Sequence, residues 1–298
     1  MKTLIISLIL LNSNLLFSQI KAKIIDFETK ENLPFVNIWV ENENIGTTST
    51  LSGEFELDVV NVNKTVVFSS IGYETKRIQA DSIHNIVELI PQITELNEVF
   101  IHSKIQTKEF VIGRFDKSKI NFYFGSGSKP WIVARYFEYH EDYNQTLFIK
   151  SIKVLTKSDV KDSKFNVRLY SVGEHGEPEH YLYDENIIGI AKKGKHITEI
   201  DLSNLNITFP KKGFFIAIEW LIIETNKFEF SFKMENSKEK FSRISYEPGI
   251  AVVPEDTDEN SWLFSQGKWK KVFQNKETSN EKFSGKFNIL AIELTLSN

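Results

Sequence analysis

The sequence of 298 residues contains no cysteine. Without thiols the chain has neither a disulfide framework nor a thiolate ligand for a metal ion. A cysteine that could carry a lipid after a signal peptide is also absent, so we do not expect a bacterial lipoprotein. Proline and methionine are sparse as well, with 7 and 2 residues.

The chain has no excess of basic residues. It contains 36 Lys and Arg against 40 Asp and Glu, which gives a formal net charge of −4. Such a balance argues against a nucleic-acid partner or an anionic membrane surface. No apolar run after the first 18 residues is long enough to span a bilayer, which takes about 20 residues. We therefore expect no transmembrane segment.

Residues 1–18 have the pattern of a secretory signal peptide. Lys2 supplies the positive start, residues 4–11 form an apolar segment, and cleavage is expected before Gln19. The alternative is a membrane anchor, but the apolar run is about half the required length. The sequence therefore predicts an exported protein, in the periplasm or associated with the outer surface.

Helical periodicity is nearly absent, and short segments with a period of two recur along the chain. Val36, Ile38 and Val40 form one apolar row, and residues 55, 57 and 59 form another. Such alternation is typical of strands with one buried face. Trp39 points away from its apolar row, so we expect it to contact another domain.

The segment from Asp26 to Tyr73 resembles the carboxypeptidase-regulatory-like domain, a transthyretin-like sandwich of seven strands. The matching positions are Asp26, Leu33, Pro34, Val36, Gly46, Thr47, Gly53, Phe55, Ile71, Gly72 and Tyr73. The sequence departs from the family pattern at Ala22, where a glycine is usual, and at Thr50, where an aspartate is usual. The resemblance implies a fold, and it says little about function because such modules are appended to many kinds of protein.

The resemblance places the first domain at residues 19–103. Residues 104–130 are rich in Lys, Ser and Gly, which predicts a linker. About ten candidate strands follow in residues 131–298, as in a jelly-roll-like sandwich. This second domain resembles a region of uncharacterised exported Bacteroidota proteins and, in architecture, non-catalytic jelly-roll domains that bind glycans. The predicted fold class is therefore all-β.

Motifs for catalysis are missing. His196 and Glu199 have the local spacing of a zinc carboxypeptidase site, but no histidine follows them and a strand would place them on opposite faces. No serine lies in a nucleophile elbow. A pair of carboxylates for glycan hydrolysis cannot be assigned from sequence, although Glu219 lies in an apolar run and is expected to be partly buried.

One acidic segment offers a metal site. Asp256, Asp258 and Asn260 alternate like the first ligands of a calcium loop. Ser261 stands where such a loop needs glycine, and no bidentate glutamate follows. A solvated acidic loop is the main interpretation, and a weakly bound structural calcium ion is the alternative.

Three aromatic residues offer a glycan site. Trp262 and Trp269, with Tyr246, could form a platform on which a sugar ring stacks. The alternative is that they pack within the sandwich. We predict an exported, non-catalytic binding or scaffolding protein of the cell envelope whose partner is a glycan or an envelope protein. A spacer without a small ligand and a glycan hydrolase stay open as alternatives.

Overall fold

The computed structural model describes residues 18–59, 61–92, 107–127, 131–233, 239–276 and 281–298. The predicted signal peptide, apart from Ser18, and the end of the first predicted domain at residues 93–103 lie outside these ranges. The described residues form strands and short 3-10 helices only, so the predicted all-β fold is confirmed. None of the described helices has the length and apolar character needed to cross a membrane.

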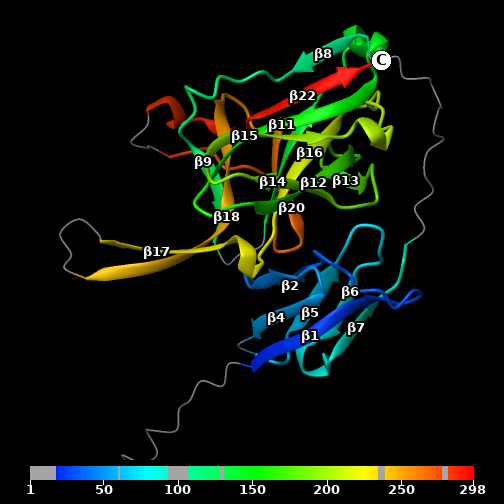
Figure 1. The fold of residues 1–298 in the computed structure, drawn as a ribbon, viewed down its shortest axis with the longest axis vertical. Coiled ribbons are helices and arrows are strands. Elements are labelled where there is room, and N and C mark those ends of the chain that lie inside the picture. The colour runs from blue at the N-terminus through cyan, green and yellow to red at the C-terminus, as the bar shows by residue number, and fades with distance from the viewer. Residues whose placement is uncertain (1–17, 60, 93–106, 128–130, 234–238, 277–280) are drawn as a thin grey trace, which may run out of the picture.

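The N-terminal sandwich comprises β1 to β7 in two sheets, at the bottom of Figure 1. One sheet has the order β4 (Glu54–Val59), β1 (Ser18–Asp26) and β7 (Ile86–Leu89). The other has the order β3 (Gly46–Thr48), β2 (Asn37–Val40), β5 (Thr65–Ser69) and β6 (Lys76–Gln79), followed by the 3-10 helix η1 (Ala80–Ser82). Only β1 and β7 pair in parallel among these strands.

The alternation in the sequence positions these strands. In β4 the acidic residues are exposed, whereas Phe55, Leu57 and Val59 are buried. They pack against Val36, Ile38 and other residues of the facing sheet in one hydrophobic core. Gly53 precedes β4 with φ 78°, and a Cβ there would lie 2.5 Å from the Ile24 carbonyl oxygen, so the close approach of β1 requires glycine.

The C-terminal sandwich is formed by β8 to β22 around a second, larger core. Its seven-stranded sheet contains β10 (Ile132–Phe137), β12 (Ser163–Val172), β13 (Pro178–Tyr181), β14 (Ile187–Ala191), β16 (Phe214–Trp220), β19 (Ser261–Ser265) and β20 (Lys268–Lys271). Its eight-stranded sheet contains β8 (Glu109–Ile112), β9 (Tyr123–Ser126), β11 (Phe148–Ser158), β15 (Gly194–Asp201), β17 (Lys227–Lys233), β18 (Lys240–Glu255), β21 (Phe287–Leu290) and β22 (Ile292–Ser297). The connecting 3-10 helices are η2 (Glu141–Gln145), η3 (Ser203–Leu205), η4 (Glu224–Asn226) and η5 (Glu281–Phe283).

Strand β16 is buried along its whole length. Phe214, Ile216, Ile218 and Trp220 face the large core, whereas Phe215 and Ala217 belong to a smaller cluster on the opposite face of the sheet. A strand covered on both faces has a continuous apolar sequence instead of an alternating one.

The stretch predicted as a linker contributes two strands to the C-terminal sandwich. β8 pairs with β22 at the edge of the eight-stranded sheet, and β9 pairs with β18. Residues 109–112 and 123–126 of the predicted linker are therefore strands of this sheet. Their polar composition reflects an edge position, where strands tolerate charged and small residues.

Strands β17 and β18 form a two-stranded ribbon that extends away from the body of the molecule (Figure 1). One face of this ribbon carries Phe228, Phe230, Phe232 and Phe241, whose rings follow one another at centroid distances of 5.9 to 6.1 Å. Phe230 and Phe232 are 36% and 38% exposed.

Two residues of the family motif, far apart in sequence, meet in the N-terminal sandwich. Asp26 ends β1 and accepts hydrogen bonds from the amides of Glu28 and Thr29, each at 2.7 Å. Its second oxygen accepts the Tyr73 hydroxyl at 2.8 Å. The Thr29 amide, with the Tyr73 hydroxyl, holds the pKa of Asp26 below its usual value although burial opposes this. Burial and the bond to Asp26 raise the pKa of Tyr73 to about 12.

We expect substitutions at this bond to weaken the N-terminal sandwich. Tyr73→Phe removes one hydrogen bond and should lower the free energy of unfolding by about 1 kcal/mol, and Asp26→Asn should lower it more because three hydrogen bonds are affected. The pKa of Asp26 is lowered in the folded state, so its contribution is present above its unfolded pKa of about 3.9 and is lost as pH falls below that value.

Thermal unfolding as a function of pH measures this dependence. The unsubstituted protein should lose stability below about pH 4 more steeply than Asp26→Asn. Equal melting temperatures and equal acid profiles for the two proteins would show that the bond contributes nothing.

Candidate functional site

The two sandwiches meet through side chains of β2 and of the seven-stranded sheet. Trp39 in β2 is 8% exposed, and its ring lies edge-on to Phe264 of β19 at a centroid distance of 6.1 Å. The predicted contact between Trp39 and the other domain is therefore confirmed. Phe35 packs nearby against Leu221 and Ile223, which directly follow β16.

A buried ion pair lies at the centre of this interface. Arg168 of β12 contacts Glu219 of β16 through Nη2 at 2.8 Å and Nε at 2.9 Å, both to Oε2. The other oxygen of Glu219 accepts a hydrogen bond from the Asn37 amide of β2 at 3.0 Å. Burial lowers the pKa of Arg168, but the Glu219 carboxylate together with Tyr181 and Tyr170 raises it, and the net shift is upward. One carboxylate thus joins the two sandwiches.

A second polar contact is made beside this pair. The amide of Ile222 donates to the Thr48 hydroxyl of β3 at 3.0 Å, and both groups are buried. Gly72 also approaches the C-terminal sandwich, because a Cβ built there would lie 3.3 Å from the Asp184 carbonyl oxygen. Packing and hydrogen bonds together indicate a fixed arrangement of the two sandwiches.

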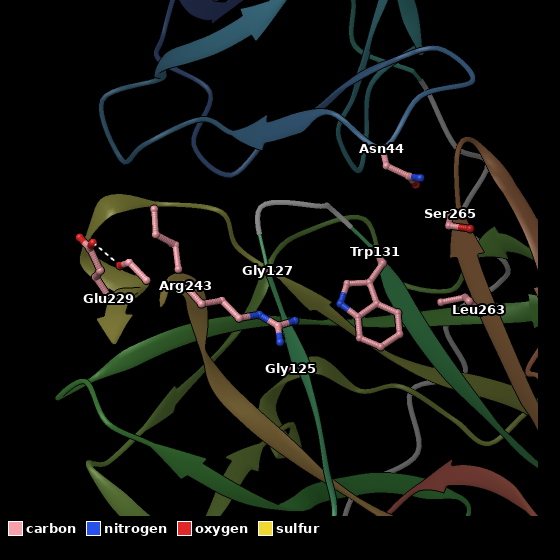
Figure 2. Close-up of a pocket in the computed structure, with 10 residues that line it drawn as sticks. Asn44, Gly125, Gly127, Trp131, Glu229, Arg243, Leu263 and Ser265 are labelled. Carbon is pink, nitrogen blue, oxygen red and sulfur yellow. Dashed lines mark hydrogen bonds between the residues drawn. The ribbon is translucent and has the colours of Figure 1, made fainter. Parts of the chain in front are cut away.

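An open cleft of about 790 Å³ lies next to this interface. One wall is the ribbon of β17 and β18, the opposite wall is β19, and the turn between β2 and β3 closes one end (Figure 2). The lining residues are Asn44, Gly125, Gly127, Trp131, Glu229, Ser242, Arg243, Ile244, Leu263 and Ser265. The cleft therefore has contributions from both sandwiches.

Trp131 supplies an aromatic surface in this cleft. It precedes β10, and its ring stacks on the buried Trp220 at a centroid distance of 5.0 Å and an interplanar angle of 14°. Trp220 is itself held by a hydrogen bond from Nε1 to the Pro248 carbonyl oxygen at 2.7 Å. Phe124 contacts the Trp131 ring edge-on. The indole is therefore fixed in place, and its remaining surface faces the cleft.

Polar groups surround the indole. Figure 2 shows Arg243 extending from β18 toward Trp131. Glu229 accepts a hydrogen bond from the Ser242 hydroxyl at 2.6 Å. Asn44 and Ser265 add an amide and a hydroxyl at the far end. A fixed ring with donors and acceptors around it suits a polar ligand that has an apolar face.

The comparisons with known proteins bear on the N-terminal sandwich. Residues 20–101 match the family model of the CarboxypepD_reg-like domain. This match supports the resemblance found in the sequence for that part of the chain. No curated protein matches the chain.

Solved structures resemble the chain only weakly. The cysteine protease and lectin-like domains of Cwp84, a surface layer associated protein of Clostridium difficile, match with 13% identity and a TM-score of 0.37, over 66% of this chain and 37% of that one. The clostridial cysteine protease Cwp84 after propeptide cleavage matches with 11% identity and a TM-score of 0.37, over 85% of this chain and 51% of that one. A structure of infectious bursal disease virus, Gx strain, matches with 10% identity and a TM-score of 0.26, over 94% of this chain and 63% of that one. The chain spans about half or less of the two Cwp84 structures, and these scores are too low to indicate a shared fold or function.

The aromatic residues predicted as a platform are not among the residues that line the cleft. Trp262 and Trp269 are on the paired strands β19 and β20 and pack with Phe264 and Tyr170 in the smaller cluster. Tyr246 lies in β18 of the other sheet, opposite Lys227. The cleft is lined instead by Leu263 and Ser265 of β19 and by Ile244 of β18. Trp131 was not proposed from the sequence, although it follows the Gly- and Ser-rich segment directly.

The residues predicted as calcium ligands make other contacts. The Asp256 carboxylate forms an ion pair with Lys286. The backbone oxygen of Asp258 accepts Lys271 Nζ at 3.1 Å, and the backbone oxygen of Asn260 accepts the Tyr136 amide at 2.9 Å. Across the part of the chain that the structure describes, no group of three or more His, Cys, Asp or Glu residues is placed to hold a metal ion.

The residues considered for catalysis are separate from the cleft. His196 contacts the Lys193 carbonyl oxygen, and Glu199 lies near Ser151. Glu219 is buried as expected and is engaged by Arg168. Of the residues described around the cleft, Glu229 is the one carboxylate.

We expect the interface carboxylate to be important for stability. Glu219→Gln leaves the Arg168 charge buried without a counter-charge and should lower the free energy of unfolding by about 3–5 kcal/mol. Urea denaturation measures the change. Glu199→Gln, at an exposed carboxylate, is the matched control and should change stability by less than about 0.5 kcal/mol.

A double substitution separates the ion pair from packing. Replacing both partners with apolar residues, as Arg168→Met with Glu219→Leu, should cost less than Glu219→Gln alone. A greater loss in the double variant, or none in Glu219→Gln, would contradict the role given to this pair.

Proposed function

We propose that this chain is an exported, non-catalytic binding protein of the cell envelope, and that it binds a glycan in the cleft between its two sandwiches. The observation that carries this proposal is the Trp131 indole, stacked on Trp220 and directed into a cleft with polar groups on several sides. Sugar rings present an apolar face that stacks on aromatic rings, while their hydroxyls bind polar side chains.

The polar groups around the indole support a sugar ligand. Arg243 offers five donors, Glu229 offers acceptor oxygens, and Asn44 and Ser265 can donate and accept. Gly125 leaves the backbone of β9 accessible at the floor, since a Cβ built on it meets nothing within 4 Å. The ribbon extends the wall beyond the cleft, where Phe230 lies across from Arg243. A chain of several sugars fits this open shape better than a single small molecule.

A binding role is favoured over glycan hydrolysis. Hydrolysis in most glycosidases uses two carboxyl groups about 5–10 Å apart. Glu229 is the single carboxylate among the described residues of the cleft, and it is hydrogen-bonded to Ser242. Glu219 is committed to the ion pair with Arg168. The match of residues 20–101 to a regulatory-type domain is consistent with this choice.

The proposed location follows from the sequence. Residues 1–18 have the pattern of a signal peptide, and the chain has no cysteine for lipidation. We place the protein in the periplasm or at the outer surface.

A glycan array with matched variants tests this proposal. The unsubstituted protein should bind a defined group of glycans, and Trp131→Ala and Arg243→Ala should each weaken the signal at least about tenfold, the loss expected when a stacked ring or charged donor worth about 1.4 kcal/mol or more is removed. Phe273→Ala is the control, because Phe273 is 75% exposed and lies outside the lining.

The unfolding temperature separates a binding defect from misfolding. The Arg243 side chain makes no hydrogen bond or ion pair with another described residue, so Arg243→Ala should keep the unfolding temperature of the unsubstituted protein. Binding that persists in both cleft variants, or an array without any signal, would exclude the glycan site.

A further inference from the structure

A second arginine of the C-terminal sandwich points into its interior. Arg135 lies in β10 between Val133 and Phe137, whose side chains belong to the large core, and it pairs across the sheet with the core residue Ile216. The pleat places alternate residues on the same face, so the Arg135 side chain enters the space between the sheets. Its guanidinium lies 4.9 Å from the centre of the Phe137 ring.

This guanidinium is only partly satisfied. Nη1 donates to the carbonyl oxygens of Leu290 at 2.9 Å and Ile292 at 3.2 Å. Among the described residues, Nη2 and Nε have no acceptor, and no carboxylate oxygen lies within ion-pair distance. Burial lowers the pKa of Arg135 to about 10 against the opposing effect of Glu255, so the group stays charged at neutral pH. A charge held inside a protein without a carboxylate in direct contact is costly, and an anionic ligand on the guanidinium would reduce that cost.

The guanidinium borders a cavity of about 380 Å³. This cavity shares no lining residue with the cleft at Trp131. Its charged lining consists of the cations Arg114, Lys119, Arg135 and Lys282 and the carboxylates Asp116 and Glu255. Asp116 is 3.6 Å from Lys119, which leaves Glu255 as the acidic group not paired within the lining. Even without Lys282, the lining has three cations against two carboxylates.

The rest of the lining is apolar. Ile120, Val252, Phe283 and Ala291 are at most 6% exposed and form much of the wall. Phe283 is fixed by stacking on Phe122 at a centroid distance of 4.8 Å. Gly113 lies beside the guanidinium, and glycine is required there because an added Cβ would lie 2.5 Å from the Ile292 carbonyl oxygen. A ligand that reaches Arg135 must therefore combine an anionic head with an apolar body.

We propose that this cavity is a binding site for a small organic carboxylate, with the carboxylate on Nη2 and Nε of Arg135 and the apolar part against Ile120 and Phe283. The guanidinium fork matches the two oxygens of a carboxylate. The apolar wall favours such a ligand over an inorganic anion such as phosphate. The phosphate oxygens that do not contact Arg135 would be buried against this wall without hydrogen-bond donors.

Nuclear magnetic resonance titration of the protein with hexanoate, acetate and inorganic phosphate tests this site. Hexanoate should shift the amide signals of Gly113 and Ala291 at millimolar concentration. Acetate and phosphate should each bind at least threefold more weakly. Stronger binding of phosphate than of hexanoate would overturn the assigned ligand class.

Matched variants test the role of Arg135. Arg135→Met should weaken hexanoate binding at least tenfold. Arg135→Lys keeps the charge but loses the two parallel donors of the guanidinium, so its affinity for hexanoate should lie between those of Arg135→Met and the unsubstituted protein. Arg243→Met, at the other cavity, should bind hexanoate like the unsubstituted protein. If Arg135→Met does not fold, Arg114→Gln at the same cavity should weaken hexanoate binding at least twofold. No shift with hexanoate, or unchanged affinity in the Arg135 and Arg114 variants, would overturn the site.

Discussion

The arrangement of the two sandwiches depends on one buried carboxylate. Glu219 places one oxygen on Arg168 of its own sheet and the other on Asn37 of the N-terminal sandwich. A buried ion pair is weak evidence for stability in itself, because removing two charges from water is costly. The other Glu219 oxygen is nevertheless specific for docking, since it receives its Asn37 donor only when β2 lies against β16. We infer that this pair defines how the sandwiches dock, while Trp39 and Phe35 contribute the apolar contact area.

The cleft follows from that docking. Asn44 comes from the N-terminal sandwich, whereas Trp131, Arg243 and Ser265 come from the C-terminal one, so a change in docking would alter the shape of the cleft. The two inward arginines of the C-terminal sandwich differ in one respect. Arg168 is neutralised by Glu219 inside the protein, whereas Arg135 has only backbone oxygens as partners among the described residues. The first has a structural role, and the second is available to a ligand.

Much of the fold could be predicted from alternation and turn residues. Three features follow from which face of a strand each residue occupies. They are the apolar rows of β2 and β4, the interdomain position of Trp39 and the burial of Glu219. The strands β8 and β9 were missed because edge strands resemble linkers in composition. At the cleft, alternation in the sequence identified the strand that contains Trp262, but it did not show which face of that strand lines the cleft. Both faces of β19 carry apolar residues, so the distinction between Trp262 and Leu263 depends on tertiary packing. The stacking of Trp131 on Trp220 joins residues 89 positions apart, which no local pattern reveals.

The fixed docking of the two sandwiches can be measured directly, because the chain has no native cysteine. Spin labels at Glu56→Cys and Lys192→Cys, two exposed positions in different sandwiches, allow the distance between them to be measured by pulsed electron paramagnetic resonance. The account predicts one narrow distance distribution that broadens when Asn37→Ala and Glu219→Gln are added. A broad distribution in the protein with the native Asn37 and Glu219 would contradict it.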